Sequence, residues 1–218
     1  MNTLKLKEAI NLDTTLVGGQ SFNWELIGNF YYGSHQNSIL KISLEENTLH
    51  WQSYPVLNDI RIIEEYFRLS FDYESMIKSI NKGDYINDSI VKYPGLRLLK
   101  QDLFETIISF IISQNKNITS IRKTINLLKS LFGKKLVIDN RSFSLFPNLE
   151  ELSLATSEDL KPLGVGYRDK YIISAIEYLT KSNLLERYKY LSEDEVKEEL
   201  LKIKGIGNKA ADCILTFS

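Results

Sequence analysis

The chain has 218 residues, of which 43% are hydrophobic and 25% are charged, and its formal net charge is −1. This is the composition of an ordinary soluble globular chain that holds one large domain or two small ones. No apolar run approaches the roughly 20 residues that span a bilayer, and the first residues open no signal peptide, so we expect a cytoplasmic protein that does not bind membranes.

Cysteine and histidine are scarce. The single cysteine excludes an internal disulfide, and together with His35 and His50 it has no zinc spacing, so we expect no metal site. The net charge argues mildly against nucleic acid. However, residues 99–135 hold seven basic and two acidic side chains. Such a run is either a solvated helix face or a surface that faces phosphates.

The first part of the chain has the alternation of β-strands. Residues 40–52 alternate on both sides of a turn signal at 46–47, and residues 21–32 flank a second turn signal at 28–29. Both stretches predict hairpins. An antiparallel sheet with one covered face is the simplest arrangement of them.

From about Asp59 the apolar period becomes helical. Asp102, with Glu105 three residues later, is an N-cap pattern that opens a nearly all-apolar helix over 103–113, which we expect to be buried. Further helices are predicted over 118–132, over 167–179 and after a capping box at 192–195. The predicted fold class is therefore α+β, with a β-rich part before a helical one.

The last segment of the chain carries the strongest signal. Residues 201–213 predict a helix, a tight turn at Gly205-Ile206-Gly207 and a second helix with Lys209 in its first turn. The exposed N–H groups of a helix start bind anions. The arrangement therefore suits a DNA phosphate and delivers an amine to the same place.

Four segments resemble the 8-oxoguanine DNA glycosylases of the helix-hairpin-helix superfamily. They are residues 19–24 (GQSFNW), 109–118 (SFIISQNKNI), 163–168 (LGVGYR) and 205–213 (GIGNKAADC). They occur in the order of the family, and the likeness covers essentially the whole chain. It implies a β-rich domain over residues 1–100 and a helical helix-hairpin-helix domain over residues 101–218, the latter incomplete at its C-terminal end.

The resemblance implies an enzyme that removes 8-oxoguanine from duplex DNA. In the family, the lysine that matches Lys209 attacks the sugar C1′, expels the base and forms a Schiff base, which permits β-elimination of the strand. The implied partner is double-stranded DNA that contains oxidised guanine, and we expect a monomer that uses no cofactor. The alternative is a non-catalytic DNA-binding module in which Lys209 only contacts a phosphate. A third possibility, suggested by the near-neutral charge, is a helical interaction protein unrelated to DNA.

The resemblance also assigns the base-binding residues. Gly19 matches the glycine whose carbonyl accepts the N7 proton of 8-oxoguanine, and a plain turn glycine is the alternative. Cys213 matches a cysteine that packs against the flipped purine, whereas the alternative is a small buried apolar residue. Phe22 and Trp24 are expected in the sheet core.

Further positions match residues that contact DNA. Asn115 and Tyr167 match residues that fill the gap and wedge the stack when a base is extruded. Arg168 matches the arginine that binds the widowed cytosine. The alternatives are a helix-start residue that packs on its own domain for Tyr167 and a surface cation for Arg168. Gly205 and Gly207 are expected to grip the DNA backbone through the hairpin.

Two departures from the family change the expected specificity. Ser120 stands where eukaryotic members have a second cytosine-reading arginine, so we predict weak discrimination of the opposite base. Lys116 stands where many relatives have asparagine, and it either reaches a phosphate or faces solvent.

The family also uses an aspartate that would lie beyond residue 218, and for Asp212 a solvated or capping role is expected. We therefore expect a truncated piece of a longer glycosylase that excises poorly or not at all. The loss of closing helices would leave the apolar face of helix 103–113 exposed.

Overall fold

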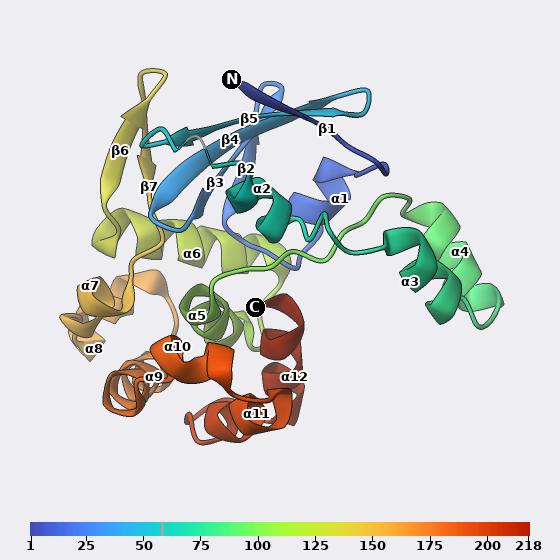
Figure 1. The fold of residues 1–218 in the computed structure, drawn as a ribbon. Coiled ribbons are helices and arrows are strands. Elements are labelled where there is room, and N and C mark those ends of the chain that lie inside the picture. The colour runs from blue at the N-terminus through green and yellow to red at the C-terminus, as the bar shows by residue number, and fades with distance from the viewer. Residues whose placement is uncertain (58) are drawn as a thin grey trace. The chain divides into compact units, whose positions relative to one another are not determined.

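The computed structural model describes residues 1–57 and 59–218 and divides into two compact units. One unit consists of residues 1–33 and 38–100, and the other of residues 34–37 and 101–218. The α+β fold class is confirmed, because an N-terminal antiparallel sheet is followed by a largely helical part (Figure 1). The division into a β-rich domain over residues 1–100 and a helical domain over residues 101–218 stays a prediction.

The first unit is built on an antiparallel sheet with the strand order β1-β5-β4-β3-β2. Its strands are β1 (Asn2–Lys5), β2 (Trp24–Ile27), β3 (Phe30–His35), β4 (Ser38–Glu45) and β5 (Thr48–Tyr54). Both predicted hairpins are present, since Glu45 pairs with Thr48 and Ile27 pairs with Phe30. The four-residue strand β1, which pairs with β5, is too short to show an alternation in the sequence.

The helices of this unit are α1 (Leu12–Leu16), α2 (Arg61–Tyr66), α3 (Tyr73–Ile80) and α4 (Asp84–Lys92). Leu40 and Trp51 of the sheet form one core cluster with Leu16 and Phe67, and all four are at most 1% exposed. Trp24 belongs to the same cluster, which confirms its predicted place in the core. Neither α3 nor α4 contains a buried residue.

The second unit is mainly helical. Its elements are α5 (Leu103–Ser113), α6 (Ile118–Phe132), β6 (Lys135–Ile138), β7 (Arg141–Ser144), α7 (Leu149–Ser153), α8 (Ser157–Leu160), η1 (Lys161–Leu163), α9 (Arg168–Ser182), α10 (Leu184–Arg187), η2 (Tyr188–Tyr190), α11 (Glu193–Leu201) and α12 (Asn208–Phe217). The predicted caps at Asp102 and Ser192 are both formed, and Ser192 completes a capping box with Glu195. The β6–β7 hairpin has no counterpart in the sequence prediction.

Helix α5 is the central element of this unit and contacts α6, α9 and α12 (Figure 1). Ile107, Ile108, Ile111 and Ile112 are fully buried on it. Its predicted burial is confirmed, and the expectation of an exposed apolar face is wrong. Both ends of the helix border pockets, with Phe104 and Glu105 at its start and Phe110 and Ser113 at its end.

Candidate active site

The predicted helix-turn-helix at the end of the chain is present. Helix α11 leads into a turn over residues 203–207, which we call the hairpin turn, and α12 begins at Asn208. Gly205 has a φ of +94°, and a Cβ there would lie 2.6 Å from the ring of Tyr171, so only glycine fits without a shift. Gly207 is the extended N-cap residue of α12 and meets no such restriction.

Lys209 lies in the first turn of α12, is exposed and borders a pocket of about 540 Å³. The lining residues are Phe110, Ser113, Gln114, Asn115, Gly205, Gly207, Asn208, Lys209, Ala210 and Cys213. Phe110, one of these lining residues, stacks on Phe217 of α12, with ring centroids 6.1 Å apart. The pocket thus brings together the end of α5 and the start of α12, two of the four segments that carried the resemblance.

The two polar neighbours of Lys209 on α12 have different surroundings. The partly buried Cys213 is a free cysteine and lines the same pocket. Asp212 instead pairs with Lys197 of α11, with 2.6 Å between the carboxylate Oδ1 and the ammonium. Asp212 is itself exposed, which agrees with the predicted solvated role, and its ion pair joins the two helices of the hairpin.

The two predicted wedge residues lie beside each other at the surface of the second unit. Asn115 follows α5 with a φ of +51°, and its Nδ2 is 3.5 Å from the hydroxyl of Tyr167. Tyr167 is 52% exposed and packs edge-on against Tyr171. It ends a turn over residues 164–167, which we call the wedge turn, directly before α9.

Arg168 is 8% exposed, so the alternative of a surface cation is wrong. Its two Nη groups donate to the backbone carbonyls of Val165, at 2.9 Å, and Gln114. Its Nε is buried and has no hydrogen-bond partner among the described residues, 1–57 and 59–218. The guanidinium also lies over the ring of Tyr167, with 4.7 Å from Cζ to the centroid. The arginine therefore ties the wedge turn to the end of α5.

Lys116 is half-buried, and two protein acceptors fix the position of its ammonium. Its ammonium donates to Thr124 Oγ1, at 2.9 Å, and to the carbonyl of Gly164, at 3.2 Å. Partial burial, and to a lesser degree the nearby charge of Arg168, lowers the pKa of this lysine. Lys116 thus neither faces solvent freely nor extends toward a phosphate in this structure.

The basic stretch from 99 to 135 does not form one surface, because Lys129 is also buried while Lys123, Lys134 and Lys135 are exposed. Among the described residues no cluster of three or more side chains suits a metal ion. Within residues 1–57 and 59–218, no helix has the length and apolar character needed to cross a membrane.

Gly19 belongs to the first unit, whereas Lys209 belongs to the second. Gly19 follows α1 with a φ of +113°, a conformation that favours glycine. The next residue, Gln20, donates to the carbonyls of Thr15 and Arg97 at 2.9 and 2.7 Å and accepts from the backbone of Leu99 at 3.0 Å. The loop that carries Gly19 is therefore fixed within its own unit.

Gln114 lies within one of the four motifs, but the sequence predicts no role for it. Its side-chain amide donates to the carbonyl of Gly205 at 2.6 Å, and its own carbonyl accepts from Arg168. The only signal in the sequence was its position between the buried helix and Asn115. Ser120 lies in the first turn of α6, where its backbone N–H donates to the N-cap Asn117.

Comparison with known proteins places these features in a family. Residues 3–107 match the family described as 8-oxoguanine DNA glycosylase, N-terminal domain. The N-glycosylase/DNA lyase of Saccharomyces cerevisiae is 35% identical over 163 residues, which are 69% of this chain and 43% of that protein.

Two solved structures are similar over nearly the whole chain. MBOgg1, in complex with a low-affinity DNA ligand, is 31% identical with a TM-score of 0.92, over 99% of this chain and 75% of that one. The Clostridium acetobutylicum 8-oxoguanine glycosylase/lyase, in complex with DNA containing cytosine opposite 8-oxoG, is 31% identical with a TM-score of 0.89, over 97% and 73%.

The chain spans less than half of the length of the yeast relative and about three quarters of the two solved chains. Identity above 30% and agreement of the fold along nearly all of its residues nevertheless leave one assignment. The chain belongs to the 8-oxoguanine DNA glycosylase family.

Proposed function

We propose that the protein is a DNA glycosylase and abasic-site lyase that removes 8-oxoguanine from double-stranded DNA. The observation that supports this most directly is the place of Lys209, an exposed amine at a helix start in a pocket of about 540 Å³. Family membership supplies the substrate class, because the similar structures include a complex with DNA that contains 8-oxoG. We further propose that the protein is cytoplasmic, where its DNA substrate would lie, and acts as a monomer.

The proposed chemistry begins with the neutral amine of Lys209. Its lone pair forms a bond to C1′ of the damaged nucleotide, and the electrons of the bond between C1′ and the base leave with the base, which takes up a proton. Loss of a proton from the nitrogen and transfer of a proton to O4′ open the sugar ring to a Schiff base. Removal of a C2′ proton then expels the 3′ phosphate, which cleaves the strand.

The other residues of the site receive roles by position. Cys213 lines the pocket that holds Lys209, and we propose that it contacts the flipped base, with the carbonyl of Gly19 as the partner of the N7 proton. Asn115 and Tyr167 would fill the space left by the extruded base, because they meet at the surface with 3.5 Å between their polar atoms. Gly205 and Gly207 would let the hairpin backbone approach a phosphate.

We propose that Arg168 supports cytosine recognition from within the protein rather than as a free surface donor. Both of its Nη groups already donate to backbone carbonyls, so a hydrogen bond to a base would use the remaining donor capacity of the guanidinium.

The test is borohydride trapping on a duplex with a preformed abasic site. This substrate needs no base removal, so it tests the amine of Lys209 separately from excision. Lys209→Gln should abolish the cross-link and keep most of the binding, whereas Lys181→Gln, at an exposed lysine of α9, should leave the cross-link unchanged.

Equal trapping by Lys209→Gln would favour the alternative, a non-catalytic hairpin module. A duplex with 8-oxoguanine in the same assay tests base excision itself.

A further inference from the structure

Three consecutive residues after helix α5 connect the two glycine turns of the second unit. The amide of Gln114 donates to the carbonyl of Gly205 in the hairpin turn, at 2.6 Å. The ammonium of Lys116 donates to the carbonyl of Gly164 in the wedge turn, at 3.2 Å. Asn115, between them, is the residue that meets Tyr167. One short segment therefore holds both turns through backbone acceptors.

We propose that Gln114 and Lys116 are positioning residues, which hold the wedge turn and the hairpin turn in one frame so that base extrusion and presentation of Lys209 occur in register. This inference rests on the proposed function and adds to it two residues that the family resemblance left without a role. We define the turn frame as the set of hydrogen bonds that Gln114, Lys116 and Arg168 make to the two turns.

Lys116 suits this role because its surroundings fix its position. Thr124 on α6, which is 5% exposed, provides the second acceptor for the ammonium, at 2.9 Å. Two of the three donors of the ammonium are thus directed at protein groups. A lysine that served a phosphate as a point charge would instead extend into solvent. The contacts favour support of the wedge turn over contact with DNA.

Gln114 joins the two halves of the frame. Its side chain reaches the hairpin turn, while its backbone carbonyl accepts from Arg168, whose other Nη donates to Val165 in the wedge turn. A continuous chain of hydrogen bonds, through Gln114 and Arg168, therefore connects Gly205 to Val165. Gly205 precedes Lys209 by four residues, so a shift of the hairpin turn moves the amine.

The frame matters for the reaction because both steps depend on position. Extruding a base costs a few kcal/mol, and inserted side chains offset part of that cost only if they enter the gap. A misplacement of about 1 Å between an amine and its target carbon can lower a rate by roughly 100-fold. Loosening the frame should therefore impair extrusion and capture of the sugar more than it impairs overall binding.

The experiment compares Gln114→Met and Lys116→Met, which keep side-chain length and remove the donors, with the unmodified protein. Four quantities are measured: the rate of borohydride trapping on a preformed abasic site, the fluorescence of 2-aminopurine beside that site, the salt dependence of duplex binding, and the melting temperature of each variant. Lys116→Arg serves as the conservative variant. Lys123→Met, at an exposed lysine of the same basic stretch, is the matched control for loss of charge.

We expect Gln114→Met to slow trapping by roughly 10-fold with little change in binding, because it frees the hairpin turn. Lys116→Met should lower the 2-aminopurine signal without changing the salt slope, and Lys116→Arg should recover at least half of that signal. Lys123→Met should leave trapping and fluorescence unchanged.

Three results would overturn the inference. If Lys116→Met lowers the slope of log K against log salt concentration by about 0.9 and leaves the fluorescence normal, Lys116 contacts a phosphate. Normal trapping by Gln114→Met would reject the turn frame and leave the proposed function standing. If all readouts fall together with the melting temperature, the two residues contribute only to the general stability of the protein. Absence of trapping by the unmodified protein would instead reject the proposed function, and the frame with it.

Discussion

The wedge turn and the hairpin turn have the same sequence pattern, but the cations that follow them have opposite surroundings. Gly164-Val165-Gly166-Tyr167-Arg168 and Gly205-Ile206-Gly207-Asn208-Lys209 each place an apolar residue between two glycines and a cation two residues later. Both lead directly into a helix. After the wedge turn the cation is buried and donates to two carbonyls, whereas after the hairpin turn it is exposed at a pocket.

The comparison shows that the pattern determines the turn and the surroundings determine the cation. Arg168 meets two inward-facing carbonyls, from Val165 and Gln114, which keep a guanidinium inside the protein. The ammonium of Lys209 makes no hydrogen bond or ion pair with residues 1–57 and 59–218, and open space lies beside it. One cation is therefore suited to hold the scaffold and the other to react.

The largest difference is expected between alanine substitutions of the first glycines. Gly205→Ala combines a φ of +94° with a Cβ 2.6 Å from the ring of Tyr171, so it should cost about 3 kcal/mol of unfolding free energy. Gly164→Ala has a φ of +62° and open space, and should cost about 1 kcal/mol. Urea denaturation measures both.

A second variant separates the two causes at Gly205. Adding Tyr171→Ala to Gly205→Ala removes the ring contact and should leave only the backbone strain, so the double variant should lose less than the sum of the single effects. Strict additivity would show that the ring plays no part. An equal cost for Gly164→Ala and Gly205→Ala would break the comparison.

Replacing Arg168 by methionine should cost about 2 kcal/mol more unfolding free energy than replacing Lys209 by methionine. Arg168→Met leaves the carbonyls of Val165 and Gln114 without their donor, and an unsatisfied buried acceptor costs about 1–3 kcal/mol. Lys209→Met changes an exposed side chain and should alter stability by less than about 0.5 kcal/mol. Thermal melts of both variants decide this, and similar losses would contradict the assignment of separate roles.

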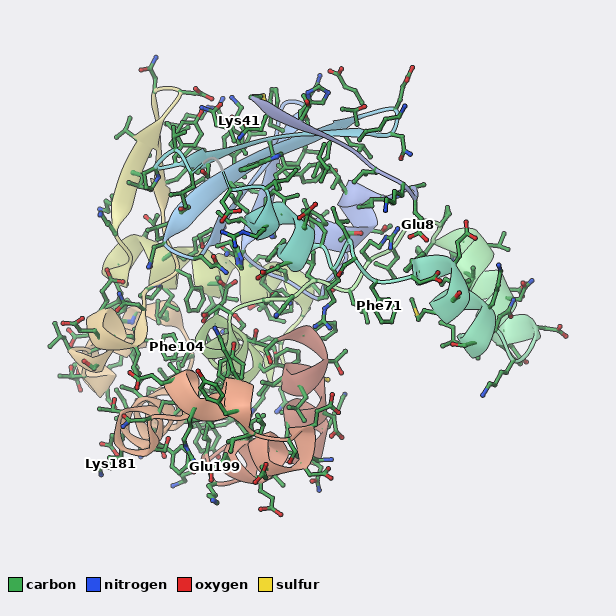
Figure 2. The ribbon with its side chains drawn as sticks, in the orientation of Figure 1. Glu8, Lys41, Phe71, Phe104, Lys181 and Glu199 are labelled. Carbon is green, nitrogen blue, oxygen red and sulfur yellow. The ribbon has the colours of Figure 1, made fainter. Side chains whose placement is uncertain are left out.

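The hairpin side should also be the more sensitive to acid. Glu199 of α11, labelled in Figure 2, accepts hydrogen bonds from Tyr178 at 2.5 Å and from Lys202, at the end of α11, at 2.7 Å, and pairs with Arg187 at 2.7 Å. The hydrogen bonds from Lys202 and Tyr178 lower the pKa of Glu199 from 4.5 to about 2. The acceptors of the wedge turn are carbonyls, which do not titrate in this range.

Because the folded-state pKa lies below the unfolded one, the contribution of Glu199 is complete above pH 4.5 and is lost as the pH falls toward 2. Glu199→Gln should therefore cost about 1.5 kcal/mol at pH 6 and much less near pH 2.5. Glu198→Gln, at an exposed neighbour, is the control. A cost for Glu199→Gln that does not change with pH, measured by urea denaturation, would contradict the ionic origin.

Much of the fold follows from local signals. The alternation on both sides of residues 46–47 and the apolar run after Asp102 predicted strands and a buried helix that the structure contains. Strand β1 and the β6–β7 hairpin were missed, because four residues give no clear period. The predicted helix start at 167 was one residue early, since Tyr167 still belongs to the wedge turn.

The site was only partly predictable for a different physical reason. Lys209 follows from the Gly-x-Gly pattern and the helix start, which are local. The burial of Arg168 and the contacts of Lys116 depend on carbonyls that lie 54 and 48 residues away in the chain, at Gln114 and Gly164. A single sequence does not reveal which backbone acceptors will face a cation, so these residues were expected nearer the surface than they are.

The smallest expected effect concerns the base opposite the lesion. Ser120 has no guanidinium fork, and the Nη groups of Arg168 are directed at carbonyls, so neither offers a free bidentate contact in this structure. We expect the unmodified protein to discriminate among the four opposite bases by less than about 10-fold in cleavage or in trapping, which is less than about 1.4 kcal/mol. Ser120→Arg should raise the preference for cytosine, whereas Thr119→Arg, which adds the same charge at an exposed neighbour, should not. A strong cytosine preference in the unmodified protein would contradict this expectation and would show that Arg168 reads cytosine, either through its remaining donors or by leaving its carbonyls.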